Sequence, residues 1–135
     1  MFLVPVTANE IPSIWHEAKP LVDKALARAD GEQLSSDVLL KLLDRTMLLF
    51  AGIEANEIAS VCIAEILVYP QKRVLHIAIS ATKNGRDFEL WNETFGVVED
   101  FGRENGCTSV SAWVRKGFVK KLKWKHKYAV LTKDL

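Results

Sequence analysis

Residues 74–87, VLHIAISATKNGRD, join an apolar strand to a polar loop that ends where a helix begins. The strand part, residues 74–80, is rich in β-branched residues, and the loop contains Gly85, which permits close backbone approach. Beyond the loop, apolar residues at spacings of three and four predict one core-facing side of a helix: Phe88, Trp91, Phe95, Val98 and Phe101. The pattern therefore changes from strand to helix across one glycine-containing loop.

Upstream of this stretch, short polar turns separate apolar runs. Residues 46–53, 57–69 and 74–80 are predicted strands, joined by turns at 54–56 and 70–73. Turns this short can only connect antiparallel neighbours, so the three strands are expected to form a meander. Residues 1–6 are predicted to form a further short strand.

Two helices are predicted between the first strand and the meander. Helical spacing of apolar residues covers residues 11–29, with Thr7 or Asn9 as the N-cap and Pro12 in the first turn. Pro20 is expected to kink this helix or to start a second one. The next helix is predicted with Ser35 or Ser36 as its N-cap and an end near residues 44–45.

Downstream, the long helix from residue 88 is expected to end at Asn105-Gly106. A strand is predicted at 109–114, a short basic helix at 117–123 and a last strand at 128–132. The predicted order is β, α, α, β, β, β, α, β, α, β. It indicates an α+β protein with a central mixed sheet and helices on both faces, in a single domain of residues 1–135.

The composition narrows the class of protein. The chain has 135 residues and a formal net charge of +1, and no apolar run approaches a membrane span of about 18 residues. Residues 1–6 lack the basic start of a signal peptide, so we expect an intracellular protein without membrane contact. Cys62 and Cys107 stand in no metal-ligand spacing, so we predict core thiols and no metal site.

Residues 115–127 are strongly basic and contain no acidic residue. Such a stretch attracts phosphate, on a nucleic acid or a cofactor, or an acidic partner. Trp124 lies among these cations, a mixture that suits nucleic-acid phosphates and bases, while the alternative interpretation is a solvated face that keeps the domain soluble. The predicted patch comprises Arg115, Lys116, Lys120, Lys121 and Lys123.

The element order resembles the GNAT (N-acetyltransferase-like) fold over nearly the whole chain. Residues 105–110, NGCTSV, and 114–122, VRKGFVKKL, resemble the small GNAT-like proteins of tailed bacteriophages. Those proteins carry Gly-Cys ahead of a strand and an Arg-x-Gly-aromatic-x-basic-x-Leu run after it. The resemblance implies an acyl-CoA-binding architecture, with acetyl-CoA as the cofactor.

In the GNAT fold the pyrophosphate of the cofactor lies on backbone N–H groups of the loop that leads into the long helix. The resemblance places this role on Thr82, Lys83, Asn84, Gly85, Arg86 and Asp87. The loop departs from the family pattern, because it is one residue short after the basic position and has Asp87 where a small residue is expected. A carboxylate there repels phosphate, and Asp87 equally suits an N-cap for a helix beginning at Phe88.

The family's chemistry also implies a base for the amine and an acid, often tyrosine, for the leaving thiolate. Glu65 and His76 are the candidates for the base, and Tyr128 is the candidate for the acid. A core histidine, a solvent-facing glutamate and a packing tyrosine are the competing interpretations of these residues.

Three functions follow as hypotheses. The first is a phage or prophage GNAT-fold protein with a degenerate acyl-CoA site, acting through binding to virion or host proteins in the host cytoplasm or the virion. The second is an acyl-CoA-dependent N-acetyltransferase acting on a small amine or a protein amine. The third is nucleic-acid binding through residues 115–127.

Overall fold

The computed structural model describes the backbone of residues 1–135 and every side chain except those of Phe88 and Leu90. Five strands form one sheet in the order β1-β2-β3-β4-β5. Strands β1 to β4 pair antiparallel, and β5 pairs parallel to β4, so the predicted meander and mixed sheet are confirmed. The strands are β1 (Phe2–Val6), β2 (Leu48–Glu54), β3 (Glu57–Val68), β4 (Arg73–Thr82) and β5 (Ser109–Ala112).

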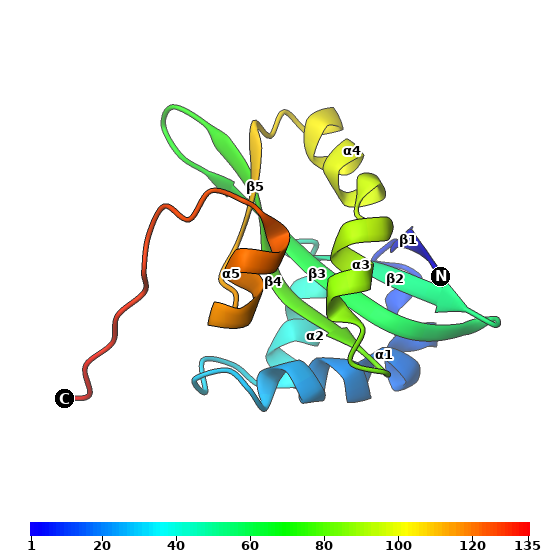
Figure 1. Ribbon diagram of the computed structural model, residues 1–135. Coiled ribbons are helices and arrows are strands. Elements are labelled where there is room, and N and C mark those ends of the chain that lie inside the picture. Colours follow the sequence, from blue (N-terminus) through cyan, green and yellow to red (C-terminus); the bar gives the residue numbers. More distant parts are fainter.

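Helices cover both faces of this sheet, as predicted (Figure 1). One core lies beneath α1 (Ile11–Leu26) and α2 (Ser35–Leu43), and a second lies beneath α3 (Asp87–Glu93), α4 (Gly96–Glu104) and α5 (Lys116–Leu122). Period-two alternation along the strands divides their apolar side chains between the two cores. In β2, for example, Leu49 belongs to the first core and Phe50 to the second.

Strand β4 contains a bulge that reverses this alternation. Ile79 lies opposite Ile63 of β3 and Ile77 lies opposite Ala64, so Ala78 is the extra residue on β4. As a result, Ile77 points into the second core and Ile79 into the first, although both are odd-numbered positions of one strand. Ala78 itself is exposed in an otherwise buried stretch.

The predicted long helix is two helices. The backbone breaks at residues 94–95, between α3 and α4. Gly96 begins α4, and glycine costs about 1 kcal/mol relative to alanine inside a helix, which favours a break there. The break still leaves Trp91 stacked on Phe95, with ring centroids 5.0 Å apart. Phe88 was predicted on the same face, but its side chain lies outside the described part of the chain.

The start of the chain also corrects two expectations. Helix α1 continues through Pro20 to Leu26, so the proline does not start a second helix. Its N-cap is Glu10, whose carboxylate accepts hydrogen bonds from the backbone N–H and the hydroxyl of Thr7 at 3.0 and 2.8 Å. Pro12 is in the first turn as predicted. Helix α2 begins at Ser35, with Leu34 as its N-cap.

The last predicted strand is wrong. Residues 123–135 form no helix or strand, and Figure 1 shows this segment leaving the body of the molecule. Residues 128–132 therefore do not extend the sheet beyond β5, which pairs with β4 alone among the described strands. Val130 and Leu131 are consequently exposed, at 61% and 89%.

Both cysteines are free thiols, and they lie where the sequence predicted, in or against the core. Cys62 is buried in the second core, and Cys107 packs against it. Burial without a charged partner raises the pKa of the Cys62 thiol to about 12. Cys62 is therefore a packing residue rather than a nucleophile.

Candidate functional site

The main cavity lies where β4 and β5 separate. The two strands pair only from Val74–Ser109 to Ile77–Ala112, and β4 then continues to Thr82 without β5 beside it. A cavity of about 270 Å³ occupies this separation. Its walls come from α1 and the following loop, from both strands and from the second helical layer: Ala25, Leu26, Arg28, Ala29, Glu32, Ile77, Ala78, Ile79, Ser80, Asp87, Trp91, Ala112, Trp113, Val114, Arg115 and Phe118.

Residues 78–80 give this cavity an unpaired strand edge. Pairing to β5 stops at Ile77, so the backbone groups of these residues that face β5 have no strand partner among the described residues. The bulge exposes Ala78 at the same point. Ser80 is held in place because its hydroxyl accepts a hydrogen bond from the Trp91 indole N–H at 3.0 Å. An extended ligand with amide groups can add to such an edge as a further strand.

His76 lies two residues before the bulge, at the closed end of the separation. Its Nδ1 is 2.9 Å from Ser111 Oγ on β5, and its ring meets the Trp113 ring edge-on at a centroid distance of 5.3 Å. The residue is 7% exposed. Burial lowers the pKa of His76 below its ordinary value of 6.5, while the charge of Glu65 opposes this shift. The imidazole is therefore neutral at pH 7, as a proton acceptor must be.

The sheet brings the two predicted base candidates together. Glu65 of β3 and His76 of β4 are direct register partners, so their side chains share one face of the sheet. The predicted acid, Tyr128, is not part of this group. It lies in the irregular C-terminal segment and is 84% exposed, because the strand expected to position it does not form.

The loop after β4 turns at Gly85. Gly85 adopts a left-handed conformation with φ of 66°, which few other residues tolerate, and a side chain there would meet no atom within 4 Å. Thr82 belongs to β4 rather than to the loop, and its carbonyl accepts a hydrogen bond from Lys24 Nζ at 2.6 Å. Asn84 is exposed. The open backbone near Gly85 is compatible with close approach of a ligand.

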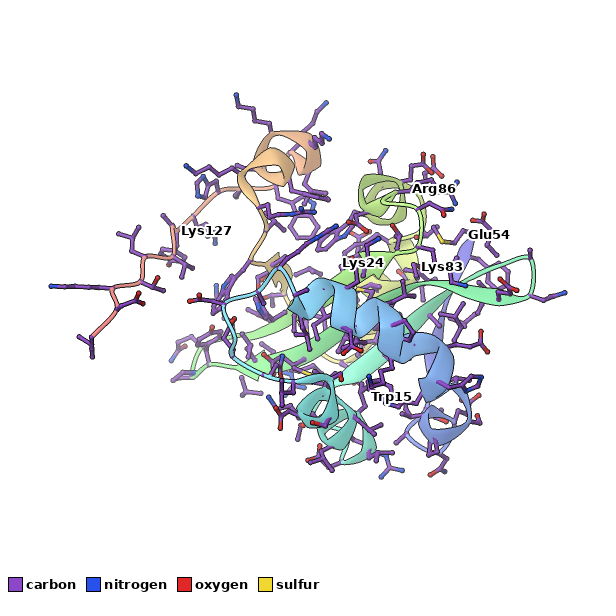
Figure 2. All side chains as sticks on the ribbon, turned by 90° about the horizontal axis from the view of Figure 1, so that it is seen from below. Trp15, Lys24, Glu54, Lys83, Arg86 and Lys127 are labelled. Atoms are coloured by element: carbon purple, nitrogen blue, oxygen red, sulfur yellow. The ribbon has the colours of Figure 1, made fainter. Side chains whose placement is uncertain are left out.

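The charges of this loop are already paired with carboxylates. Arg86 is 2.6 Å from Glu54 and 3.5 Å from Glu89, and Lys83 is 3.6 Å from Glu57. Figure 2 shows Arg86 and Glu54 at the same corner of the molecule, with Lys83 next to them. A phosphate that approaches this loop must therefore compete with these carboxylates.

Asp87 adds a negative charge at the same place. Helix α3 begins at Asp87 itself, so the carboxylate lies in the first turn rather than ahead of a helix that starts at Phe88. Its Oδ1 is buried without a hydrogen-bond partner, and Oδ2 is 4.0 Å from Arg115. Two like charges about 4 Å apart repel by about 4 kcal/mol at the effective dielectric constant typical of a protein surface. A phosphate at this loop would meet both the Asp87 carboxylate and the Arg115 guanidinium beside it.

The basic residues begin next to the same loop, because Arg115 lies 4.0 Å from Asp87. Arg115 lines the cavity, Lys116 and Lys120 are on α5, and Lys123 ends that helix in a left-handed conformation. Lys121 is exposed on the same helix. Trp124 is less available than predicted for stacking on bases, because its ring packs against Trp91 and Phe95 at 5.4 and 5.8 Å.

Sequence reasoning missed several residues that contact His76 or line the cavity. Ser111 lies 35 positions after His76 in the chain and is within hydrogen-bond distance of it. The ring of Trp113 contacts the same imidazole. Ser109, Ser111 and Trp113 alternate with Val110, Ala112 and Val114, which places them on one face of a strand but does not show what that face contacts. Arg28 and Glu32 follow α1 and reach the cavity only through the tertiary fold.

No cluster of three or more potential metal ligands is present among the described residues. Within the same part of the chain, no helix has the length and apolar character needed to cross a membrane.

The fold is shared with solved N-acetyltransferase structures. A ribosomal-protein-alanine N-acetyltransferase from Brucella melitensis biovar Abortus 2308 superimposes with a TM-score of 0.73 at 12% identity, covering 100% of both chains. A GNAT family acetyltransferase from Staphylococcus aureus gives a TM-score of 0.68 at 12% identity, again covering 100% of both. The aminoglycoside N-acetyltransferase AAC(6')-Iy, in complex with CoA, gives 0.72 at 10% identity, covering 98% of this chain and 93% of its own.

No family model matches this sequence, and no curated protein does. At these identities the structural matches define the fold alone. The chain therefore has the α+β fold of the GNAT acetyltransferases, as its element order predicted.

Proposed function

We propose that this protein is an N-acyltransferase that takes its acyl group from a pantetheine thioester, of which acetyl-CoA is the simplest source. The observation that carries the proposal is the separation of β4 from β5, which opens a cavity of about 270 Å³ lined from both faces of the sheet. Such a passage lets a thioester donor and an amine acceptor meet from opposite sides. The CoA complex of one structural neighbour supports this choice of donor.

In this proposal the pantetheine arm of the donor binds along the edge of β4 that follows Ile77. It is extended and contains amide groups, which can hydrogen-bond to the unpaired backbone of residues 78–80. Ala78 leaves room for the thioester because its side chain is small and the bulge exposes it. The arm is then held by backbone groups that do not depend on the charges of the loop.

Transfer requires the amine to lose a proton as it attacks. His76 is the base in this proposal, because its lowered pKa keeps it neutral and Ser111 orients its ring. Glu65, its register partner, favours the protonated imidazole that forms as the amine is deprotonated. The amine nitrogen bonds to the carbonyl carbon, the carbon–sulfur bond breaks, and the thiolate leaves.

The acceptor is an amine, in a small molecule or in a protein. Structural neighbours are described as aminoglycoside and ribosomal-protein-alanine N-acetyltransferases, and both modify amines. In this chain the acceptor approaches along α1 and the loop after it, where Glu32 lines the cavity. A carboxylate at this position favours an acceptor that carries positive charge.

Calorimetric titration with acetyl-CoA and with acetyl-pantetheine tests donor binding directly. Transfer is then followed by mass spectrometry with a polyamine, an aminoglycoside and a peptide with a free N-terminus as acceptors. We expect at least one thioester to bind and at least one amine to gain an acetyl group. If neither thioester binds at millimolar concentration, the acyltransferase proposal fails.

A non-catalytic role is the second candidate, favoured by the ion pairs of the loop and by the distant Tyr128. In that role the fold acts through contacts with other proteins and its donor site is degenerate. Transfer that depends on His76 would contradict it. Origin from a phage or prophage, location in the host cytoplasm or the virion, virion or host-protein partners, and nucleic-acid binding through residues 115–127 stay predictions.

A further inference from the structure

Strand β5 forms an open edge of the sheet. It pairs with β4 alone among the described strands, so the backbone groups on its outer side have no strand partner in that part of the chain. A further strand can add to such an edge through main-chain hydrogen bonds. The residues of β5, Ser109–Ala112, include no proline and no charged side chain, which are among the usual means of blocking an edge.

Apolar side chains beside this edge are only partly covered. On the side of the second core, Val110, Ala112 and Val114 pack against that core but stay partly exposed. On the other side, Trp113 is 74% exposed, although its ring contacts His76. Both sides of the sheet therefore present apolar surface that a further strand beyond β5 would cover.

A run near the end of the chain has the composition of such a strand. Residues 128–132, YAVLT, are aromatic, aliphatic or β-branched, as strand residues commonly are. Successive side chains of a strand point to opposite sides, and the first four residues of this run are all apolar or aromatic, so both sides would be apolar. A strand that faces water on one side alternates apolar and polar residues, whereas this run suits a position covered on both sides.

Within the chain this run has no strand partner. Residues 128–132 form no strand, and none of them takes part in a backbone–backbone hydrogen bond among the described residues. Their large side chains are exposed: Tyr128, Val130 and Leu131. The structure thus contains both an open strand edge and an unpaired run of matching character.

The path of the chain carries this run away from its own sheet. Trp124 is held at the body of the molecule, because its ring packs on Trp91 and Phe95 with centroid distances of 5.4 and 5.8 Å. Beyond Trp124 the chain leaves the body (Figure 1), and Figure 2 shows Lys127 on the departing part. The run is therefore presented to a neighbouring molecule.

We propose that this protein forms a two-fold dimer in which residues 128–132 of each copy add as a further strand to the open edge of β5 in the other copy. The inference goes beyond acyl transfer and does not depend on it. Each copy supplies one run and one edge, so the exchange uses both and closes without leaving either open. A second copy is the occupant because one chain carries both halves of the contact and its run lies away from its own sheet.

The exchange covers surface that the single chain leaves exposed. Side chains on one side of the added strand pack beside Val110 and Ala112, and those on the other side pack near Trp113. Main-chain hydrogen bonds to β5 supply affinity, and the alternating side chains supply the fit. A lysine stands at each end of the run, Lys127 and Lys133, as is typical of apolar strands that must stay soluble before they pair.

Sedimentation equilibrium of the full chain across the micromolar range tests the dimer directly. We expect a dimer that dissociates on dilution, because the exchanged strands are its main contact. A monomer at every concentration overturns the inference, whether the run stays free or folds onto its own β5.

Proline substitution tests whether the run makes the contact. The Val130→Pro, Leu131→Pro double variant removes two successive N–H donors, and since these point to opposite edges of a strand, one of them faces β5 in any register. Its dimer dissociation constant should rise at least tenfold, with unchanged urea unfolding of the monomer because both residues are exposed. The matched control, Lys133→Pro with Asp134→Pro, puts two prolines beyond the run and should leave the dissociation constant unchanged. An equal effect of the two double variants, or no effect of the first, overturns the exchange.

Nuclear magnetic resonance of a dimer made from isotope-labelled and unlabelled copies shows which copy supplies the run. We expect contacts between the amides of Ser109–Ala112 in one copy and protons of residues 128–132 in the other. Contacts confined to a single copy, or a dimer in which β5 has no such contact, contradict the inference. Neither result bears on acyl transfer, which thioester binding tests separately.

Discussion

His76 Nδ1 lies 2.9 Å from Ser111 Oγ, in the pair of residues just before the last pair that joins β4 to β5. The contact joins a buried imidazole to β5 next to the point where the two strands separate. It positions the ring while leaving Nε2 for another partner, the arrangement that a base requires. Whether a proton sits on Nδ1 or Nε2 follows from which of the two groups donates in this hydrogen bond.

Replacing His76 tests this role through the pH dependence of transfer. His76→Gln should lower kcat by about 100-fold, the lower range for loss of a general base, with a smaller effect on KM. Because the pKa of His76 is lowered from 6.5, the wild-type rate should fall on the acidic side only below that pH. The variant should lack this fall. Ser109→Ala, an exposed change on the same face of β5, is the control.

The pH dependence of the free energy of unfolding should also reflect the lowered pKa of His76. In the folded state the pKa of His76 is lowered from 6.5. As the pH falls, this histidine therefore binds a proton in the unfolded chain before it does so in the folded protein, and the unfolded chain becomes more favoured. The free energy of unfolding should therefore decrease as pH falls below 6.5, by at most about 1.4 kcal/mol per pH unit. Urea unfolding measured across this range should show the slope in wild type and a flatter curve in His76→Gln. Identical curves would contradict the buried, neutral imidazole.

A larger side chain at Ala78 should close the cavity. Ala78→Phe places a ring at the exposed bulge, where the thioester is proposed to lie, and should abolish binding of acetyl-pantetheine in calorimetry. The alanine side chain is not part of either core, so the free energy of unfolding should change by less than about 1.5 kcal/mol. Ala78→Ser, which keeps the volume small, should retain binding. Full binding by Ala78→Phe would place the donor elsewhere.

Gly52 should not tolerate a side chain. A Cβ atom there would collide with Ser60 Oγ across the β2–β3 pair and lie 3.1 Å from Met1 Sδ. Gly52→Ala should lower the free energy of unfolding by about 1–3 kcal/mol, the usual cost of overpacking. Gly117→Ala, where no atom lies within 4 Å, should instead stabilise α5 slightly. Urea denaturation of both variants distinguishes a local collision from a general effect of glycine.

The two thiols should differ in reactivity. Cys62 is buried and its pKa is raised to about 12, so a disulfide reagent at mildly alkaline pH should not modify it in the folded protein. Cys107 is partly exposed and should react first. In denaturant both should react at similar rates. Rapid modification of Cys62 without denaturant would indicate that the second core opens readily.

Local patterns in the sequence were enough to predict much of the fold. The meander, the two helices before it and the loop with Gly85 each depend on residues close together in the chain. Alternation and helical spacing report which side of an element is apolar, so the mixed sheet with helices on both faces followed from them. The same patterns identified Glu65 and His76 as polar positions in an apolar sheet.

Other features depended on contacts between distant residues. The bulge at Ala78 arises from the register of β3 against β4, and the cavity arises because β5 stops pairing at Ala112. The pairing of Arg86 with Glu54 joins residues from different elements, so the sequence showed two charges without showing that they neutralise each other.

The sequence by itself determined the order and type of most elements, because hydrophobic periodicity is written into neighbouring residues. It could not show that residues 128–132 remain unpaired, because an apolar run becomes a strand only when an edge accepts its backbone. Only the tertiary structure decided where β4 and β5 separate, which side chains meet His76 there, and which carboxylates pair with Arg86 and Arg115. Each of these is set by packing between segments that are far apart in the chain.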